Sequence, residues 1–337
     1  MQVNDLTDRP TLSIVVPLYN SASEVPRLVE EICHLQVAGG LELILVNDGS
    51  EDNTAEVCRR LIGERAESIT FVDLSRNFGE HNAVMAGLRQ AAGAYVINLD
   101  DDLQNPPSEA LKLLAHAQLH GFDVVYSRFR KKRHSLWRNL GSWMTNRVGD
   151  FLLNKPRGLY LSSFRCMSAF AVREITQYVG PFPYIDGLLF QVTAKVGSIE
   201  VEHAPRLSGQ SGYTFRRLVR LWLNMFINFS VMPLRASTVF GLLMSIFGFV
   251  FTGLVIIENL TVGTPLGWSS LMSVLLVFSG TQLLVIGVMG EYLGRLYLTT
   301  MQRPQSIVRE VVTKGSVRSP EEQTKAKTTT IHPPDSQ

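Results

Sequence analysis

The chain has 337 residues, of which 45% are hydrophobic and 18% are charged, and its formal net charge is +2. So small a net charge gives no support to a nucleic-acid partner, and the aromatic and aliphatic content excludes a fully disordered chain. The charges are unevenly spread, because Glu258 is the only Asp, Glu, Lys or Arg between Ala236 and Gly290. This distribution excludes a single, uniformly soluble globule.

The N-terminal decapeptide MQVNDLTDRP is polar and carries no apolar signal-peptide core, so we expect the first domain to stay on the side where it is synthesised. Cys33, Cys58 and Cys166 are widely spaced and form no CxxC or Cys/His ligand pattern. A reducing, cytoplasmic setting is the simpler interpretation.

Short runs rich in β-branched residues alternate with segments of helical length and period over the first 126 residues. The predicted strands are Leu12–Val16, Leu41–Val46, Ile69–Asp73, Tyr95–Leu99 and Phe122–Tyr126, and the predicted helices are Glu24–Leu35, Asn53–Ile62, Glu80–Ala92 and Ser108–Leu119. This alternation predicts an α/β fold with right-handed crossovers and a mostly parallel sheet covered on both faces. In such sheets the ligand site lies at the carboxyl ends of the strands.

Polar residues concentrate at those predicted strand ends. They are Pro17–Asn20, Asn47–Ser50, Ser75–Gly79 and Asp100–Asp102. The turn at Asp48 is either a base- or ribose-recognition site or an ordinary turn with a helix cap at Asp52 or Asn53. The GxGxxG and GxxxxGK[ST] fingerprints of dinucleotide and P-loop sites are missing.

The triple aspartate Asp100–Asp102 is the strongest candidate for chemistry. Adjacent carboxylates repel one another unless something neutralises them. Hard oxygen ligands on a turn suit Mg²⁺ or Mn²⁺, which takes one or two carboxylates and completes its shell with substrate phosphates and water. The alternative is a helix N-cap, with Pro106 and Pro107 in the first turn of the next helix.

Two basic segments have the pattern of amphipathic helices. The first follows Lys131–His134, and the second, Tyr213–Val231, places Arg216, Arg217 and Arg220 beside Phe, Trp and Leu. Basic helices with aromatic faces are typical of the membrane interface, and a packed helix with a solvated edge is the alternative.

Two charge-free stretches follow, Ala236–Ile257 and Ser269–Gly290. Each is long enough to cross a bilayer core. Arg235 precedes the first and Arg295 follows the second, while the connection between them has no Lys or Arg. The positive-inside rule then predicts that both termini are cytoplasmic. The polar tail from about Lys314 is predicted to be disordered.

Six ordered motifs together with these spans resemble the polyprenyl-phosphate branch of glycosyltransferase family 2. The resemblance runs from about residue 11 to 311, and its motifs are VVPLYN (Val15–Asn20), VNDGSED (Val46–Asp52), LSRNFGEHNAVMAG (Leu74–Gly87), LDDDLQNPP (Leu99–Pro107), SGQSGY (Ser208–Tyr213) and GEYLGRLY (Gly290–Tyr297). It implies a GT-A fold, which is Rossmann-like and binds a nucleotide-sugar and a divalent metal.

The resemblance also implies roles for individual residues. The nucleotide-sugar pocket would contain Pro17, Tyr19, Asn20, Asp48, Asn77, Asp100 and Asp101. The metal, Mg²⁺ or Mn²⁺, and the diphosphate would face Asp100, Asp102 and Gln104, with Asp102 and Arg206 in catalytic roles. The acceptor phosphate would contact Arg128, Arg206, Gln210 and Tyr213, and Arg128 and Arg206 also have the alternative of solvated surface charges.

Three positions depart from the family pattern. Ser21 stands where an acidic residue often follows PxYN, Ser163 stands where relatives commonly have a carboxylate proposed as base, and Gly212 replaces a basic residue of the acceptor loop. A lipid monophosphate is already largely deprotonated at neutral pH and needs little help from a base. Asp186 is the candidate substitute carboxylate, with a loop-turn aspartate as the alternative.

The expected organisation divides the chain into a nucleotide-binding core and membrane elements. Residues 1–130 form the GT-A core, 131–154 and 213–233 the two interfacial helices, 155–212 the rest of the catalytic domain, 234–293 the two transmembrane helices, and 294–337 a cytoplasmic tail.

The function expected is transfer of one sugar, with inversion, from a nucleotide-sugar, preferably a UDP-sugar, to undecaprenyl phosphate at the cytoplasmic face of a bacterial inner membrane. Membrane lipids and further copies of the chain, as in a tetramer, are the other expected partners. The alternatives are a processive polysaccharide synthase, whose QxxRW motif is missing, and a non-catalytic component of a sugar-export complex.

Overall fold

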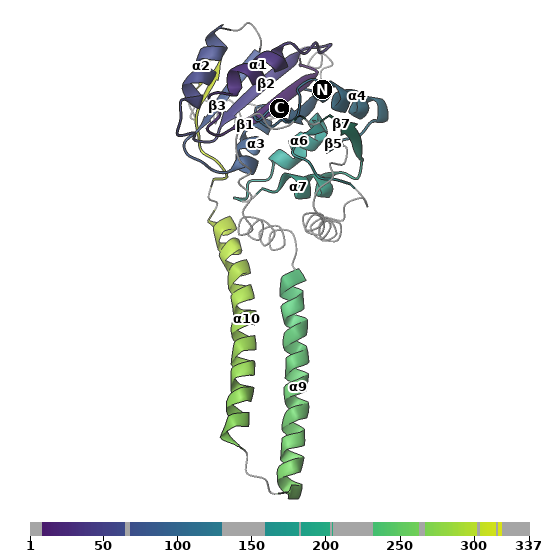
Figure 1. Cartoon of the computed structure of the whole chain (residues 1–337), viewed down its shortest axis with the longest axis vertical. Coiled ribbons are helices and arrows are strands. Elements are labelled where there is room, and N and C mark those ends of the chain that lie inside the picture. Colours follow the sequence, from purple (N-terminus) through teal and green to yellow (C-terminus); the bar gives the residue numbers. More distant parts are fainter. Residues whose placement is uncertain are drawn as a thin grey trace, which may run out of the picture. The chain divides into compact units, whose positions relative to one another are not determined.

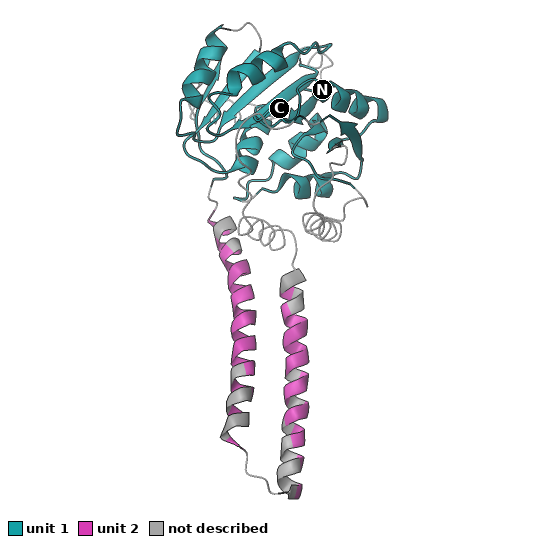
Figure 2. Cartoon of the chain, in the orientation of Figure 1, with its two compact units in different colours: residues 1–212, 304–337 teal, residues 213–303 magenta. Residues whose placement is uncertain are grey.

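The computed structural model describes residues 9–64, 68–129, 159–181, 183–202, 204, 232–262, 267–301, 304–314 and 316–318. The chain divides into two compact units (Figure 2). Unit 1 combines residues 1–212 with 304–337, and unit 2 comprises residues 213–303. The predicted interfacial helix 131–154 and almost all of the second one, 213–233, lie outside the described residues.

Unit 1 is an α/β domain whose described strands form one nine-stranded sheet in the order β7-β5-β6-β4-β1-β2-β3-β8-β9. Its elements are β1 (Leu12–Leu18), α1 (Val25–Cys33), β2 (Leu41–Asn47), α2 (Thr54–Glu64), β3 (Ser68–Leu74), α3 (Glu80–Leu88), β4 (Tyr95–Asn98), α4 (Glu109–His120), β5 (Val124–Phe129), β6 (Arg165–Ser168), α6 (Ala169–Thr176), α7 (Ile185–Val192), β7 (Val196–Val201), β8 (Val308–Thr313) and β9 (Ser316–Arg318). The predicted strands and helices of the first 126 residues are present, with ends shifted by a few residues.

The sheet is mixed, so the expectation of a mostly parallel sheet is corrected. Strands β4, β1, β2 and β3 are parallel neighbours, and β7 is parallel to β5. Antiparallel pairing occurs where β6 inserts between β4 and β5 and where β8 and β9 extend the sheet beyond β3. Residues of the expected tail therefore form strands, and β9 lies within the region that was expected to be disordered from Lys314.

Helices cover both faces of the sheet, as expected (Figure 1). Helices α1, α2 and α4 pack on one face around a cluster that includes Leu28, Phe71 and Phe164. Helices α3, α6 and α7 pack on the other around Val15, Met85 and others. The central strands are buried on both faces, which explains why they read as nearly continuous apolar runs.

Unit 2 contains two long helices, α9 (Met232–Val262) and α10 (Trp268–Thr300). They contact each other, and Gly248 admits a close approach, because a Cβ at this position would lie 2.6 Å from Cζ of Phe278. Among the described residues, one window, Val277–Gly294 of α10, is long and apolar enough to cross a membrane, and none of it is buried within the protein. The apolar stretch identified in α9, Ser237–Gly248, is shorter.

Candidate active site

The carboxyl ends of four adjacent parallel strands, β4, β1, β2 and β3, meet at one edge of the sheet. The loops that follow these strands begin at Leu99, Tyr19, Asp48 and Ser75. Because parallel strands end on the same side, the polar motifs at the four strand ends come together as expected.

Asp100 is held by two neutral donors. The Ser163 hydroxyl donates to Asp100 Oδ2 over 2.6 Å, and Asn105 Nδ2 donates to the same oxygen over 3.4 Å. Burial raises the pKa of Asp100 to about 6, and the charges of Glu80 and Asp102 act in the same direction, while the bond from Ser163 opposes them. A carboxylate in this position gains strongly from a nearby cation.

Asp101 connects the loop after β4 to the loop after β1. It accepts a hydrogen bond from the Ser21 hydroxyl, and Ser21 is itself fixed by its N–H, which donates to Thr54 Oγ1 over 2.9 Å. Burial raises the pKa of Asp101 to about 6, and the charges of Asp100 and Asp102 add to this.

Asp102 and Gln104 form a tight turn. The Gln104 N–H donates to Asp102 Oδ1 over 3.1 Å, and Leu103 between them has a φ of 56°, in the left-handed region that a leucine rarely adopts. The Gln104 carbonyl accepts from the N–H of Ala204 over 2.8 Å. Ala204, which lies two residues before Arg206 in the sequence, therefore contacts this turn.

The helix-cap alternative for the triple aspartate does not hold in the structure. The N-cap of α4 is Ser108, and none of the three aspartates occupies that position. Asp52, by contrast, does act at the start of α2, because its Oδ1 accepts from the Thr54 N–H over 3.1 Å. Asp52 therefore makes a side-chain bond at the start of α2, as the ordinary-turn alternative for Asp48 expects.

Asp48 fixes the loop Ser75–Gly79, hereafter the RNFG loop. Its carboxylate accepts the backbone N–H groups of Phe78 over 2.7 Å and Gly79 over 2.9 Å. Burial raises its pKa, and the two N–H bonds counteract this. Gly49 has a φ of 62°, and a Cβ there would lie 2.3 Å from the carbonyl carbon of Arg76. The two loops are thus in direct backbone contact.

The other predicted nucleotide-pocket residues lie at the same edge. Tyr19 is 45% exposed, Asn77 is exposed, and Pro17 lies in β1 opposite Val46. Asn20 has a φ of 54°, and its Oδ1 accepts from the Glu51 N–H over 2.8 Å. The Tyr19 ring is therefore accessible to a ligand, and the hydrogen bond from Glu51 to Asn20 fixes the residue next to it.

Asp186 is engaged in a buried ion pair. Arg165 Nη1 contacts Asp186 Oδ1, and the Tyr126 hydroxyl donates to the same oxygen over 2.8 Å. No hydrogen bond between Asp186 and the triple aspartate occurs among the residues described. The charge of Arg165 nevertheless lowers the pKa of Asp100 against the effect of burial.

Of the four predicted acceptor residues, the described part of the chain contains Arg128. Arg128 lies in β5 opposite Glu200 and is exposed. Arg206, Gln210 and Tyr213 lie outside the described residues. Their roles stay predictions.

The residues around Asp100 fit a divalent cation in part. Within the described ranges, no three His, Cys, Asp or Glu side chains come together as a ready metal cluster. Asp100 and Asp102 supply two carboxylates, which is the usual protein share for Mg²⁺ when substrate phosphates complete the shell. Asn105 Oδ1 is buried and has no hydrogen-bond partner among the described residues. The donors are all hard oxygens, as such a cation requires.

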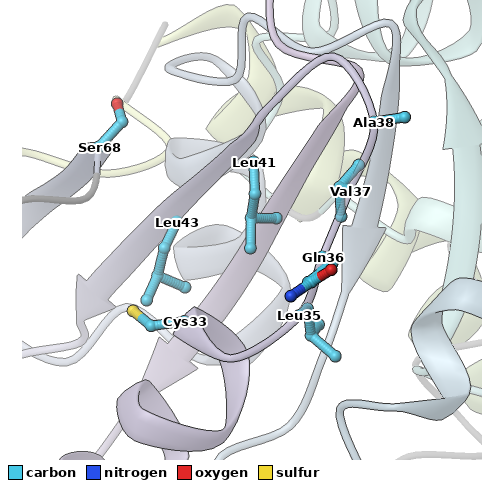
Figure 3. A pocket seen from close by; sticks show the side chains of 8 residues that line it. All are labelled: Cys33, Leu35, Gln36, Val37, Ala38, Leu41, Leu43 and Ser68. Atoms are coloured by element: carbon cyan, nitrogen blue, oxygen red, sulfur yellow. The ribbon is translucent and has the colours of Figure 1, made fainter.

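A cavity of about 650 Å³ lies elsewhere, at the amino ends of β2 and β3 (Figure 3). Cys33, Val37, Leu41 and Ser68 are among its lining residues. It is at the opposite edge of the sheet from the aspartates, so we assign it no part in the chemistry.

Residues 13–176 match the family model for glycosyl transferase family 2. The undecaprenyl-phosphate 4-deoxy-4-formamido-L-arabinose transferase of Enterobacter sp. (strain 638) is 33% identical over 320 residues, covering 92% of this chain and 96% of that relative. The transferase of the same name from Pseudomonas savastanoi pv. phaseolicola (strain 1448A / Race 6) is 35% identical over 324 residues, covering 90% and 92%. The chain belongs to glycosyltransferase family 2.

Within family 2 the chain groups with the polyprenyl-phosphate glycosyltransferases and is an enzyme of the transferase class. Its α/β domain has the expected GT-A type of fold, built on a mixed sheet. Glucosyl-3-phosphoglycerate synthase from Mycobacterium tuberculosis, solved with Mn²⁺, UDP and glucosyl-3-phosphoglycerate, is 17% identical, covers 65% of this chain and 78% of that chain, and has a TM-score of 0.48.

Several residues at the site of this family 2 enzyme were not predicted as functional. Ser21 and Ser163 were noted only as departures from the pattern, yet each donates to one of the aspartates. Glu80, the first residue of α3, acts on Asp100 through its charge. Its position directly after the RNFG loop is the sequence signal that points to it.

Proposed function

We propose that the enzyme transfers one sugar from a nucleotide-sugar, with a UDP-sugar favoured, to undecaprenyl phosphate. The observation that carries the proposal is the likeness to the transferases of Enterobacter and Pseudomonas over about nine-tenths of the chain. It is supported by the concentration of Asp48 and Asp100–Asp102 at the strand ends where α/β folds bind ligands.

The donor is proposed to lie across the RNFG loop and the turn Asp100–Gln104. Asp100, Asp102 and Gln104 would hold a divalent cation, Mg²⁺ or Mn²⁺, and Tyr19, Asn20 and Asn77 would contact the nucleotide. When bound, the cation supplies positive charge that offsets the charge developing on the leaving diphosphate. Ser163 and Asn105 hold the Asp100 carboxylate in one orientation for that purpose.

The acceptor phosphate is proposed to attack the anomeric carbon directly, with inversion. Its oxygen is already largely ionised at neutral pH, so proton removal demands little of the protein. Arg128, Arg206, Gln210 and Tyr213 are proposed to bind this phosphate. Asp186 is less suited to act as a base, because Arg165 and Tyr126 occupy its carboxylate, and we assign it a supporting role.

The enzyme is proposed to be an integral protein of the bacterial inner membrane, with α9 and α10 as two spans and both termini cytoplasmic. Support comes from the apolar window Val277–Gly294 and from Arg235 and Arg295, which flank the charge-free stretches. A membrane-bound enzyme meets a membrane-bound acceptor without a search through bulk water. Homo-oligomerisation is part of the same proposal.

The test is transfer of radiolabelled sugar to undecaprenyl phosphate by the full-length protein. The donor panel begins with the UDP derivative of 4-deoxy-4-formamido-L-arabinose, the sugar in the relatives' names. We expect transfer that requires Mg²⁺ or Mn²⁺ and is abolished by Asp102→Ala. Binding of a donor without turnover across the whole panel would support a non-catalytic component instead.

A further inference from the structure

The residues that follow α10 form part of the sheet of unit 1. We call Pro304–Thr313 the return segment; it begins four residues after the end of α10 at Thr300. Its strand β8 pairs antiparallel with β3, with a register shift between Asp73 and Leu74. In Figure 1 the return segment is the yellow strand beside β3. Val311 is buried in the cluster that also contains Val72 and Met85. The return segment is thus a packed part of the domain.

The return segment fixes the first residue of the RNFG loop. The Ser75 N–H donates to the Ile307 carbonyl over 2.9 Å. Arg309 Nη2 donates to the Ser75 carbonyl over 3.2 Å. Both backbone polar groups of Ser75 are therefore bound by residues that lie more than 230 positions later in the chain.

The same segment holds the helix that follows the RNFG loop. Gln305 is 6% exposed, and its Oε1 accepts from Arg89 Nη2, at the end of α3, over 2.6 Å. Gln305 Nε2 donates to the Gly180 carbonyl over 2.9 Å. Since the buried amide uses both its donor and its acceptor, loss of Gln305 would leave Arg89 and Gly180 without these bonds.

A charged contact reinforces the pairing of β8 with β3. Arg59 of α2 contacts Glu310 of β8 at 2.5 Å and Asp73 of β3 at 3.3 Å. The Arg59 side chain is 41% exposed, so this network contributes modestly. The network links β8 to β3 close to Leu74, the residue at which β3 ends and after which the RNFG loop begins.

We propose that the return segment is a positioning element of the donor site. Its residues bind the backbone of Ser75 at the start of the RNFG loop and Arg89 at the end of α3. The Asp48 carboxylate binds the N–H groups of Phe78 and Gly79 at the other end of the loop. With both sets of hydrogen bonds in place, the loop is preorganised to bind the nucleotide. The proposal rests on the proposed function in one respect, namely that the RNFG loop contacts the donor.

The test uses the full-length protein in detergent and compares wild type with Arg309→Ala, Gln305→Ala and the paired variant. Backbone amide hydrogen exchange is measured for Phe78 and Gly79. We expect these amides to exchange about tenfold faster in the paired variant, because the loop opens locally more often. With UDP and Mg²⁺ as the probe, we expect binding to be about fivefold weaker.

The matched control is Arg173→Ala with Gln177→Ala. Both residues are exposed on or next to α6 and bond locally to Glu174, so we expect exchange at Phe78 and UDP affinity to stay at wild-type values. Arg309→Ala alone removes an exposed side chain and tests the contact at Ser75 if the paired variant does not fold.

Unchanged exchange at Phe78 and Gly79 in a folded paired variant would overturn the proposal, and if the paired variant does not fold, unchanged exchange in both Arg309→Ala and Gln305→Ala would overturn it. So would faster exchange with undiminished UDP affinity, because the loop would then be held for another purpose. A wild-type protein that binds no UDP would count against the proposed donor, while the exchange data would still decide whether the return segment holds the loop.

Discussion

Ser163 donates a 2.6 Å hydrogen bond to Asp100 from a position 63 residues later in the chain. The Ser163 carbonyl in turn accepts from Asn98 Nδ2 over 3.0 Å, so its backbone is fixed to the end of β4. At the position where the family resemblance led us to expect a carboxylate, this enzyme has a neutral hydroxyl that donates to an aspartate. The serine therefore orients Asp100 and adds no further negative charge.

Ser163→Ala is expected to lower the proposed sugar transfer about tenfold, because a hydrogen bond to a charged group contributes about 1.5–3 kcal/mol. The metal concentration for half-maximal activity should rise, since Asp100 loses its orientation. Steady-state kinetics over a Mg²⁺ titration measure both effects. Thr176→Ala, which removes an exposed hydroxyl bonded to the Arg173 carbonyl, is the control and should change neither.

The buried pair Arg165 and Asp186 should be coupled in stability. Arg165→Met and Asp186→Asn each leave one buried charge uncompensated, and each is expected to lower the free energy of unfolding by about 3–5 kcal/mol. The combined variant Arg165→Met with Asp186→Leu should recover most of that loss. Thermal melting measures this. Loss of transfer in a folded Asp186→Asn protein, with transfer retained in Arg165→Met, would restore Asp186 as a candidate base.

Gly49→Ala should damage the donor site, because φ is 62° and a Cβ would lie 2.3 Å from the Arg76 carbonyl carbon. We expect a donor KM raised about tenfold or more, with loss of stability. Gly63→Ala is the matched control, because a Cβ added at this position in helix α2 would meet no atom within 4 Å. There alanine should stabilise the helix by about 1 kcal/mol.

Acid should destabilise the enzyme in part through His81. Burial lowers its pKa below the ordinary value of 6.5, and Arg165 acts in the same direction while Asp186 opposes it. Below about pH 6.5 the unfolded state therefore binds more protons at this site than the folded state does. Stability falls as pH falls from about 6.5 towards the lower folded pKa, and below that pKa this site causes no further loss. His81→Gln should flatten the dependence of melting temperature on pH between about 7 and 5.

A charge at the centre of the apolar window of α10 should weaken membrane insertion. Ile286→Arg places a guanidinium within Val277–Gly294, at a cost of about 2.5–3.5 kcal/mol at the middle of a span. Leu296→Arg, beyond the window, is the control. Alkaline extraction of membranes compares the two, and full retention of Ile286→Arg would contradict a lipid-facing role for this part of α10.

The sequence predicted the central strands because burial on both faces produces unbroken runs such as LELILV. It did not predict β6, whose four residues Arg165–Ser168 include an arginine and a serine. Nor did it predict β8 and β9, because residues 294–337 were expected to form a cytoplasmic tail that is polar and disordered from about Lys314. The pairing of β8 with β3 joins segments more than 230 residues apart, and β9 then pairs with β8. No local periodicity records such contacts.

The types of the site residues could be used to predict where the site lies, but the partners of their hydrogen bonds and ion pairs could not be predicted. Asp48 and the triple aspartate were recognisable because polar groups at the ends of buried strands need a reason to be there. That Asp48 would bind the N–H groups of Phe78 and Gly79, or that Asp186 would pair with Arg165, depends on how loops meet after folding. These relationships are set by tertiary packing, which a single sequence does not display.

The discontinuity of unit 1 has a consequence for biosynthesis. Its edge strands β8 and β9 are translated only after both long helices. A nascent chain that ends before α9 has β3 as an exposed edge, with unpaired backbone groups that invite association with other chains. The catalytic domain of this enzyme is thus completed only after the ribosome has passed α10 and synthesised β8 and β9, so folding of the whole domain follows synthesis of both long helices.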